Sequence, residues 1–158
     1  MEKYVYIFDI DGVLADIDHR MKFIRDKDYE KFYSDEEMIK DRALRSGIEL
    51  LKNLKRARRD NTEIVFATGR PEKTRRITKT WLWNNLQELD NLYMRKDGDY
   101  RPSDIVKVEL VSKIVEDLKL NNDSSCVMFI DDDPKNVIAI EKNFGIRGLV
   151  FGTSRMEE

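Results

Sequence analysis

The sequence predicts an α/β fold, a Rossmann-like three-layer sandwich in which helices cover both faces of a central, mostly parallel sheet. Two observations support this prediction. Short runs of β-branched and aromatic residues, typical of buried strands, recur along the chain. Longer segments with the apolar spacing of helices lie between these runs. Such alternation is typical of parallel sheets with right-handed crossovers.

Three segments are predicted to be buried strands, and each ends at a polar residue. They are residues 4–8 before Asp9, residues 64–67 before Thr68, and residues 127–130 before Asp131. Residues 92–94 and 149–151 are two weaker strand candidates.

Four helices are expected between the strands. Ser46 and Glu49 have capping-box spacing, which predicts that a helix opens there. Pro71 suits the first turn of a second helix that runs to about Leu89.

The other two predicted helices lie in the second half of the chain. Ser103 or Asp104 can cap a helix that runs to about residue 118. Pro134 suits the start of the last helix, which Gly145 would stop.

Residues 16–45 fit the alternation least well, so we expect a small helical insertion after the first strand. Ser34 and Glu37 have capping-box spacing within it. The insertion is too short for an independent domain, which predicts a single domain over residues 1–152. Residues 153–158 are expected to be a frayed tail.

Composition limits the class of protein. The chain has 158 residues, one cysteine and a formal net charge of −2, which argues against a wholly basic nucleic-acid coat and excludes an intramolecular disulfide. No apolar run approaches the roughly 20 residues that a membrane helix needs. The first strand begins almost at the start, leaving no room for a signal peptide. We therefore expect a cytoplasmic protein without a membrane or an obligate protein partner.

Polar residues at the strand ends predict the functional site, because ligands of open α/β sheets bind beyond the carboxyl ends of the strands. Asp9 and Asp11 follow the first strand, and Asp131 follows another. Several carboxylates in one crevice repel each other unless a cation joins them, and hard oxygen ligands suit Mg²⁺. Thr68 and Gly69 offer a hydroxyl and backbone N–H groups for a phosphate. Lys107 can add a positive charge.

Four motifs in this order resemble the haloacid dehalogenase (HAD) phosphatase superfamily, and the resemblance covers nearly the whole chain. The motifs are residues 9–13 (Asp-Ile-Asp-Gly-Val), residues 68–70 (Thr-Gly-Arg), Lys107, and Asp131-Asp132. The resemblance implies that Asp9 is the nucleophile that forms an aspartyl-phosphate. It implies that Asp11 is the general acid and then the general base.

The same resemblance assigns the remaining roles. Thr68 would bind phosphate oxygens, and Lys107 would hold Asp9 and the phosphate. Mg²⁺ would be the cofactor. Its ligands would be Asp9, the backbone carbonyl of Asp11, Asp131 and Asp132.

Three local features resemble the phosphatase half of phage-type polynucleotide kinase–phosphatase, a family of nucleic-acid repair enzymes. They are Arg20 shortly after the first motif, Arg70 directly after Thr68-Gly69, and the basic, acid-containing segment 95–107, which includes Arg101. The resemblance implies removal of 3′-phosphates from DNA or RNA ends, and opening of 2′,3′-cyclic phosphates in related members. Arg20, Arg70 and Arg101 would then bind the substrate.

Two departures from the family are visible. The family has a functional aspartate four residues before the lysine, where this chain has Ser103; Asp104 lies one position later. Either Ser103 or Asp104 would fill that substrate-binding position. The chain also lacks the phosphate-binding loop motif of a kinase domain, which predicts a phosphatase that stands alone.

Two other functions remain open from the sequence. A small-molecule phosphatase for nucleotides or sugar phosphates is one, although such enzymes often use a larger cap to close the site. A degenerate binding module is the other, but its expected signature is a missing nucleophile or lysine, and both residues are present.

Overall fold

Five strands form one parallel sheet in the order β5-β4-β1-β6-β7, in a computed structural model that describes residues 2–57, 59–88, 91–120 and 125–152. The strands are β1 (Lys3–Phe8), β4 (Thr62–Pro71), β5 (Leu92–Arg95), β6 (Ser125–Asp131) and β7 (Arg147–Val150). The central strand β1 is therefore the first strand in the chain, and its two neighbours, β4 and β6, carry the motifs at Thr68 and Asp131.

The inner strands β1 and β4 are largely buried on both faces, and their side chains alternate between two cores. Val5 and Ile7 of β1 belong to one core, and Phe8 belongs to the other. Strand β4 shows the same alternation, with Val65 in the first core and Phe66 in the second. This pattern explains why the strand sequences are apolar almost throughout.

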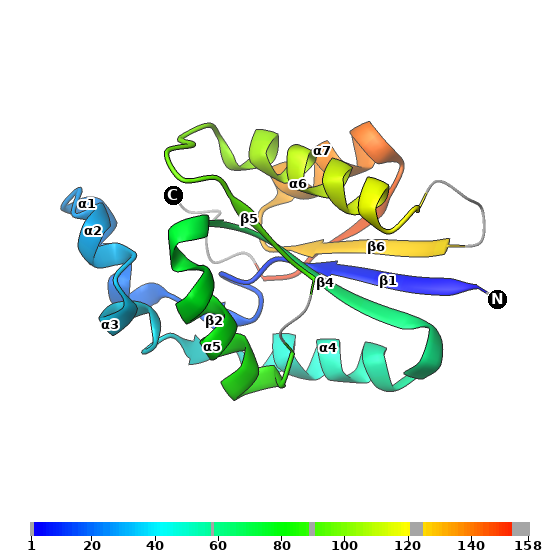
Figure 1. Ribbon diagram of the computed structural model, residues 1–158, viewed down its shortest axis with the longest axis horizontal. Helices are drawn as coiled ribbons and strands as arrows, with labels where there is room; N and C mark the ends of the chain where they lie inside the picture. Colours follow the sequence, from blue (N-terminus) through cyan, green and yellow to red (C-terminus); the bar gives the residue numbers. More distant parts are fainter. Residues whose placement is uncertain (1, 58, 89–90, 121–124, 153–158) are drawn as a thin grey trace.

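Two helices cover each face of the sheet, as Figure 1 shows. Helices α4 (Arg45–Ala57) and α5 (Arg75–Leu86) pack on one face, and α6 (Ser103–Asp117) and α7 (Pro134–Phe144) pack on the other. The predicted three-layer α/β sandwich with a parallel central sheet is confirmed.

Between β1 and α4 the chain forms the insertion. Its ends pair as a short antiparallel ribbon, and it contains four short helical segments. The elements are β2 (Ala15–Asp16), η1 (Asp18–Arg20), α1 (Met21–Arg25), α2 (Tyr29–Phe32), α3 (Asp35–Met38) and β3 (Arg42–Ala43). Ser34 accepts a hydrogen bond from the backbone N–H of Glu37, so it caps α3 as expected. In Figure 1 the insertion lies beyond the carboxyl ends of the strands.

The predicted start of the helix after β4 is wrong. The strand continues to Pro71, which pairs with Arg95 of β5 after a shift in register, and its backbone is extended at φ −72° and ψ 152°. A short 3₁₀ segment, η3 (Glu72–Thr74), follows before α5 begins. Helix α5 ends at Leu86 because Gln87 adopts a left-handed conformation. Leu89, where the helix was expected to end, lies outside the described residues.

Two other predicted helix starts also differ from the structure. Ser46 lies inside α4 rather than at its cap, and the next residue, Gly47, packs against the chain after β1. A Cβ atom on Gly47 would lie 1.8 Å from the carbonyl oxygen of Val13, so this close approach requires glycine. Helix α6 begins at Ser103 without a side-chain cap.

The predicted limits of α7 are confirmed. Asp133 caps the helix, Pro134 opens it, and Gly145 ends it at φ 67°. A further short 3₁₀ segment, η2 (Arg59–Asn61), precedes β4.

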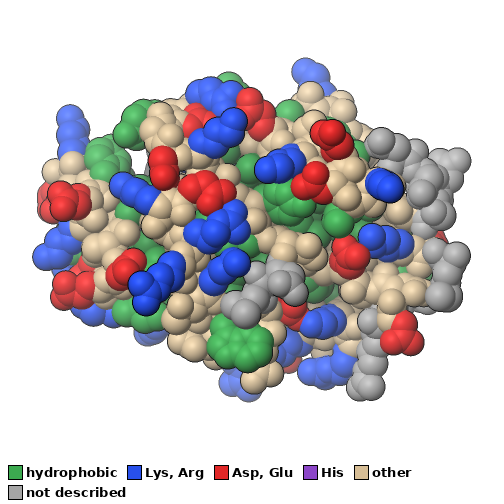
Figure 2. All heavy atoms as spheres, in the orientation of Figure 1, with side chains coloured by type: hydrophobic (Ala, Val, Ile, Leu, Met, Phe, Trp, Pro, Cys, Tyr) green, Lys and Arg blue, Asp and Glu red, His purple; other side chains and the backbone are tan. Residues whose placement is uncertain are grey.

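The surface carries mixed charge. On the face shown in Figure 2, basic and acidic side chains are interspersed, in keeping with the net charge of −2. No helix among the described residues is long and apolar enough to span a bilayer. Any recognition of an anionic ligand therefore depends on a local group of cations rather than on a uniformly basic face.

Candidate active site

Three buried carboxylates meet at the carboxyl ends of β1 and β6. Asp9 follows β1, Asp131 ends β6, and Asp132 comes next in the chain. Each side chain offers an oxygen atom, and these oxygens lie within 4.8 Å of one another. The parallel pairing of β1 with β6 produces this meeting, because the register aligns Phe8 with Ile130.

Lys107 supplies the positive charge within this carboxylate cluster. Its Nζ lies 2.9 Å from Asp9 Oδ1 and 2.9 Å from Asp131 Oδ2, and it donates a hydrogen bond of 2.7 Å to the carbonyl oxygen of Ala67 in β4. Helix α6 brings this lysine over the sheet from the face opposite helix α4. Lys107 therefore joins three neighbouring strands at one point.

The electrostatics favour the charged form of this ion pair. Burial acts to lower the pKa of Lys107, but the charges of Asp131 and Asp9 outweigh it and raise that pKa above its usual value. Burial likewise acts to raise the pKa of Asp131, and the charge of Lys107 reverses the shift and lowers it. Breaking such a pair leaves an uncompensated buried charge, which costs about 3–5 kcal/mol.

Asn136 and Ser103 form a second layer around Asp131. Asn136, in the first turn of α7, donates hydrogen bonds of 3.1 Å to both Asp131 Oδ2 and Ser103 Oγ. Ser103, four residues before Lys107, thus reaches the carboxylate cluster through Asn136. Asp104 is half-buried in the first turn of α6.

Gly12 explains why glycine follows the two aspartates of the first motif. Its φ is +86°, and a Cβ atom there would lie 2.0 Å from Asp132 Oδ2. The chain after β1 can therefore turn closely over Asp132 only with glycine at this position.

Asp11 belongs to a second, neighbouring ionic cluster. Arg70 donates to Asp11 Oδ1 from both Nε and Nη2, at 3.0 Å and 2.6 Å. Arg70 is fully buried and also donates to Asp41 Oδ2 at 2.9 Å and to Thr78 Oγ1 at 3.3 Å. Burial acts to lower the pKa of Arg70, but the charge of Asp11 and its hydrogen bonds raise it.

Arg20 joins this second cluster from the insertion. Its Nε and Nη2 each donate to a different oxygen of Asp41 at 2.8 Å, and its Nη1 donates to the carbonyl oxygen of Phe32. The guanidinium lies 4.5 Å from the centre of the Phe32 ring, and Arg20 Nη2 is 3.7 Å from Asp11 Oδ1. Burial raises the pKa of Asp41, and the hydrogen bonds from Arg20 oppose that shift. Asp41 thus binds two arginines at once and connects the insertion to Asp11.

Thr68 and Gly69 lie within β4 rather than at a helix start. The Thr68 hydroxyl is buried and accepts a 3.1 Å hydrogen bond from the backbone N–H of Arg70. The carbonyl oxygen of Gly69 accepts one of 2.9 Å from Arg95 Nε. Arg101 lies farther out, 44% exposed, and is paired with Asp99 and Glu109.

The sequence motifs therefore meet in two adjoining groups. Asp9, Lys107, Asp131 and Asp132 form the carboxylate cluster, and Asp11, Arg20 and Arg70 form an arginine cluster with Asp41. The structure brings neither Asp104 nor Arg101 into direct contact with these groups. The three buried carboxylates of the first group offer hard oxygen ligands and could bind a metal ion.

Four residues of the site lie outside the motifs. Asp41, Asn136, Arg95 and Tyr33 were not predicted as site residues. Tyr33 lies close enough to the arginine cluster that the charge of Asp11 adds to the effect of burial in raising the pKa of Tyr33. Arg95 ends strand β5, so the rule that polar residues end parallel strands would have found it. Asn136 lies two residues after the proline that opens α7, which places it over the strand end. Asp41 and Tyr33 belong to the irregular insertion, where no sequence pattern marks them.

Comparisons with known proteins place the chain among the HAD-type phosphatases. It belongs to the family of polynucleotide kinase PNKP phosphatase domains, whose family model matches residues 3–151. No curated protein matches the sequence.

Solved structures share the fold. A chain of the Pnkp1/Rnl/Hen1 RNA repair complex superposes with a TM-score of 0.71 at 21% sequence identity, covering 96% of this chain and 44% of that chain. Class C acid phosphatase from Bacillus anthracis with tungstate bound gives a TM-score of 0.62 at 13% identity, covering 98% and 68%. The HAD domain of effector protein Lem4 from Legionella pneumophila gives 0.51 at 13%, covering 97% and 88%. This chain spans less than half the length of the repair-complex chain.

Proposed function

We propose that this protein is a Mg²⁺-dependent phosphatase that removes the 3′-phosphate from DNA or RNA ends through an aspartyl-phosphate intermediate. The observation that carries the chemistry is the contact of Asp9 with Lys107 inside the buried carboxylate cluster. Membership of the polynucleotide kinase PNKP phosphatase family supports the polynucleotide substrate. Opening of a 2′,3′-cyclic phosphate belongs to the same proposal.

In the first step, a carboxylate oxygen of Asp9 attacks the phosphorus atom. A bond from Asp9 to phosphorus forms, and the bond from phosphorus to the 3′ oxygen breaks. Asp11 donates a proton to that leaving oxygen, so a 3′-hydroxyl results. The paired hydrogen bonds from Arg70 to one Asp11 oxygen hold this carboxyl group in position for the transfer.

In the second step, Asp11 acts as the general base. Its carboxylate takes a proton from water, the water oxygen bonds to phosphorus, and the bond from phosphorus to Asp9 breaks. Inorganic phosphate leaves and Asp9 returns as a carboxylate. Arg70 stabilises the ionised form of Asp11 that this step requires.

Lys107 and Thr68 stabilise the reacting groups. Lys107 holds Asp9 and offsets the charge that gathers on the phosphoryl oxygens, since it is buried between two carboxylates and stays protonated. The hydroxyl of Thr68 and the backbone beside it would bind a phosphoryl oxygen. Arg20, Arg70 and Arg101 remain proposed contacts of the substrate.

The carboxylate cluster fits a hard divalent cation. Asp9, Asp131, Asp132 and the backbone carbonyl of Asp11 would hold Mg²⁺. When bound, the ion would let an anionic nucleophile approach an anionic phosphate. The fit rests on the donor set, which is three buried carboxylates with one lysine to balance them.

Mg²⁺ should stabilise the fold as well as support activity. We expect the melting temperature to rise by about 5–10 °C when free Mg²⁺ exceeds its Kd a hundredfold, because the ion binds only the folded protein. Asp132→Asn should reduce that rise, whereas Glu116→Gln, an exposed carboxylate on α6, should not. EDTA should abolish turnover, and Ca²⁺ should restore it poorly. Full activity in EDTA, or an unchanged rise in the Asp132→Asn variant, would contradict a metal site here.

The substrate is tested by phosphate release with Mg²⁺ from a set of matched compounds. A 3′-phosphorylated oligonucleotide should be hydrolysed much faster than the 5′-phosphorylated oligonucleotide, mononucleotides or a sugar phosphate. DNA and RNA versions are compared directly, and the Asp9→Asn protein controls for contaminating phosphatases. Equal turnover of the oligonucleotide and the sugar phosphate would overturn the polynucleotide proposal and point to a small-molecule phosphatase.

A further inference from the structure

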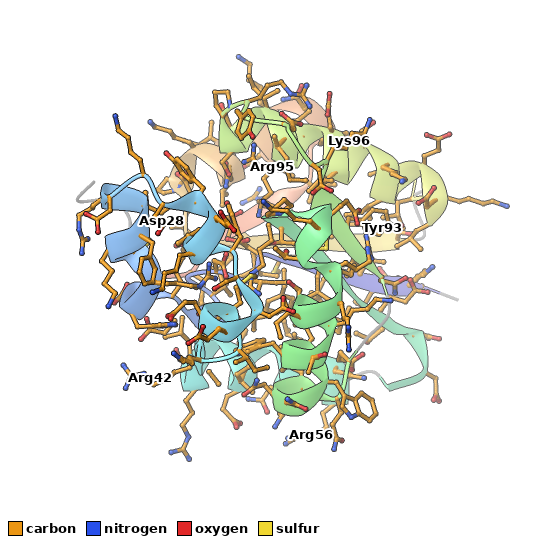
Figure 3. The ribbon with its side chains drawn as sticks, turned by 60° about the vertical axis from the view of Figure 1, so that its left-hand side comes forward. Asp28, Arg42, Arg56, Tyr93, Arg95 and Lys96 are labelled. Atoms are coloured by element: carbon orange, nitrogen blue, oxygen red, sulfur yellow. The ribbon has the colours of Figure 1, made fainter. Side chains whose placement is uncertain are left out.

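Two helices bring polar side chains together beside Asp131. Ser103 opens α6 and Asn136 lies in the first turn of α7, and both helices pack on the same face of the sheet (Figure 1). Figure 3 looks toward this end of the molecule, where Lys96 begins the loop that leads into α6. The proposed reaction steps use neither Ser103 nor Asn136, although Asn136 is 2% exposed and borders the carboxylate cluster.

Asp131 is held by three hydrogen bonds that fix both of its oxygens. Its Oδ2 accepts from Lys107 Nζ of α6 at 2.9 Å and from Asn136 Nδ2 of α7 at 3.1 Å. Its Oδ1 accepts from the backbone N–H of Asp133 at 2.9 Å. Since a carboxylate has about four acceptor positions, these bonds leave Oδ1 as the oxygen with a position to offer. The bonds therefore determine which oxygen of Asp131 faces the lysine and which can face a cation.

Ser103 in turn holds the side-chain amide of Asn136. Asn136 Nδ2 donates its second hydrogen bond to Ser103 Oγ at 3.1 Å, and the backbone N–H of Asn136 donates to the carbonyl oxygen of Asp133 at 3.1 Å. Ser103 and Lys107 are four residues apart on α6, so they lie on the same face of that helix. Helix α6 thus acts on Asp131 twice, directly through Lys107 and indirectly through Asn136.

The amide of Asn136 adopts this orientation at a cost in stability. Its Oδ1 is buried and has no hydrogen-bond partner among the residues that the structure describes. The reverse orientation is worse, because an ionised carboxylate only accepts hydrogen bonds and needs Nδ2 beside it. A buried acceptor without a partner destabilises the folded state, and such atoms are rare outside functional sites. The stability of the fold alone therefore does not account for asparagine at this position.

We propose that Asn136 is a positioning residue, which together with Ser103 orients Asp131 and so sets the affinity of the carboxylate cluster for Mg²⁺ and its preference for Mg²⁺ over Ca²⁺. The inference rests on the proposed function, because it takes the carboxylate cluster as the metal site. It adds two residues that never touch the ion but control how well the cluster binds it.

The physical reason is that the two ions differ in the geometry they require. Mg²⁺ requires near-ideal octahedral coordination, whereas Ca²⁺ accepts more ligands in looser arrangements. A carboxylate whose rotation is prevented before the ion binds should therefore favour Mg²⁺. Loss of a hydrogen-bond partner behind a metal ligand typically lowers metal affinity or activity by about 10- to 100-fold.

Titration calorimetry without substrate tests the role of Asn136 directly. In Asn136→Ala we expect the Kd for Mg²⁺ to rise by about 10- to 100-fold. The ratio of the Kd for Ca²⁺ to the Kd for Mg²⁺ should fall in the same variant. Asn143→Ala is the matched control, since Asn143 is an exposed asparagine on α7 whose side chain bonds only to the carbonyl oxygen of Ala139 in that helix. Its Kd values should equal those of the wild type.

A double-mutant cycle tests the connection through Ser103. Ser103→Ala should raise the Kd for Mg²⁺ less than Asn136→Ala does, because it removes only the outer bond. In the Asn136→Ala background, Ser103→Ala should have no further effect, since Ser103 acts on Asp131 through Asn136. Independent, additive effects of the two substitutions would contradict this connection. If Asn136→Ala fails to fold, Ser103→Ala carries the test alone, and an unchanged Kd then overturns the proposal.

Stability and turnover separate positioning from a merely structural role. The melting temperature of Asn136→Ala in EDTA should stay close to that of the wild type, because the lost bond to Asp131 and the removal of the unpartnered oxygen have opposite effects. Its turnover should be low at limiting Mg²⁺ and recover at saturating Mg²⁺. A merely structural role would lower the melting temperature in EDTA and leave the Kd for Mg²⁺ unchanged.

Two outcomes distinguish failure of this inference from failure of the proposed function. A wild-type protein that binds no Mg²⁺ would overturn the metal site and this inference with it. A wild type that binds Mg²⁺, with the same Kd and the same Ca²⁺-to-Mg²⁺ ratio in Asn136→Ala, would overturn the inference and leave the proposed metal site intact.

Discussion

Replacing Asp9 with asparagine is expected to lower turnover of a 3′-phosphorylated oligonucleotide by a factor on the order of 10⁴ or more. The amide is a poor nucleophile and cannot form the aspartyl-phosphate. The substitution is nearly isosteric, so the buried cluster should keep its shape, and circular dichroism checks that it does. Phosphate release under excess Mg²⁺ measures the loss.

The intermediate itself can be trapped with a second variant. In Asp11→Asn the first step can still occur slowly, but no carboxylate remains to activate water. Labelled phosphate from the substrate should then stay on the protein after an acid quench, and the Asp9→Asn/Asp11→Asn double variant should carry none. Near-normal turnover in Asp9→Asn, or label on the double variant, would show that the covalent mechanism is wrong.

Lys107→Met should damage both catalysis and stability. The substitution leaves Asp9 and Asp131 buried without their shared cation, which should cost about 3–5 kcal/mol of unfolding free energy at pH 7 in EDTA. Turnover should fall by a factor on the order of 10³ because the phosphoryl oxygens lose their nearest positive charge. Lys113→Met, an exposed lysine on the same helix, is the control and should change neither.

The ion pair of Lys107 with Asp131 also predicts how the free energy of unfolding depends on pH. The pKa of Asp131 is lowered from 3.8 in the folded protein, so its stabilisation is present above that value and is lost as pH falls through the lower, folded pKa. The pKa of Lys107 is raised from 10.5, so its stabilisation is present below that value and is lost at higher pH. Urea unfolding should therefore show a nearly constant difference between wild type and Lys107→Met across neutral pH. The difference should shrink at the acidic end, and an equal difference at pH 3 and pH 7 would contradict the ion pair.

The strands and their polar ends could be predicted because local sequence determines them. Residues 64–67, for example, are apolar at every position, as expected for a strand that is buried on both faces. The end of each run then shows which side chains meet, since parallel strands align their carboxyl ends. Asp9 and Asp131 were predicted in this way, and both lie in the buried carboxylate cluster.

Other features depend on tertiary contacts that no local pattern records. Pro71 matches a helix start, but pairing with Arg95 of β5 keeps it in the strand. Asp41 is the partner of Arg20, yet 21 positions separate the two residues within an irregular segment. Their meeting depends on how the insertion folds back over the sheet, which spacing alone cannot reveal.

The hydrogen bonds that Asp41 accepts tie the insertion to the rest of the domain. Asp41 binds an arginine of the insertion and an arginine of β4, and the second of these arginines positions Asp11. A chimera that replaced the segment between β1 and α4 with the cap of another phosphatase would leave Arg70 buried beside one carboxylate instead of two. Specificity in this lineage should therefore diverge by substitution on the outer surface of the insertion, at positions such as Tyr29, and not by exchange of whole caps.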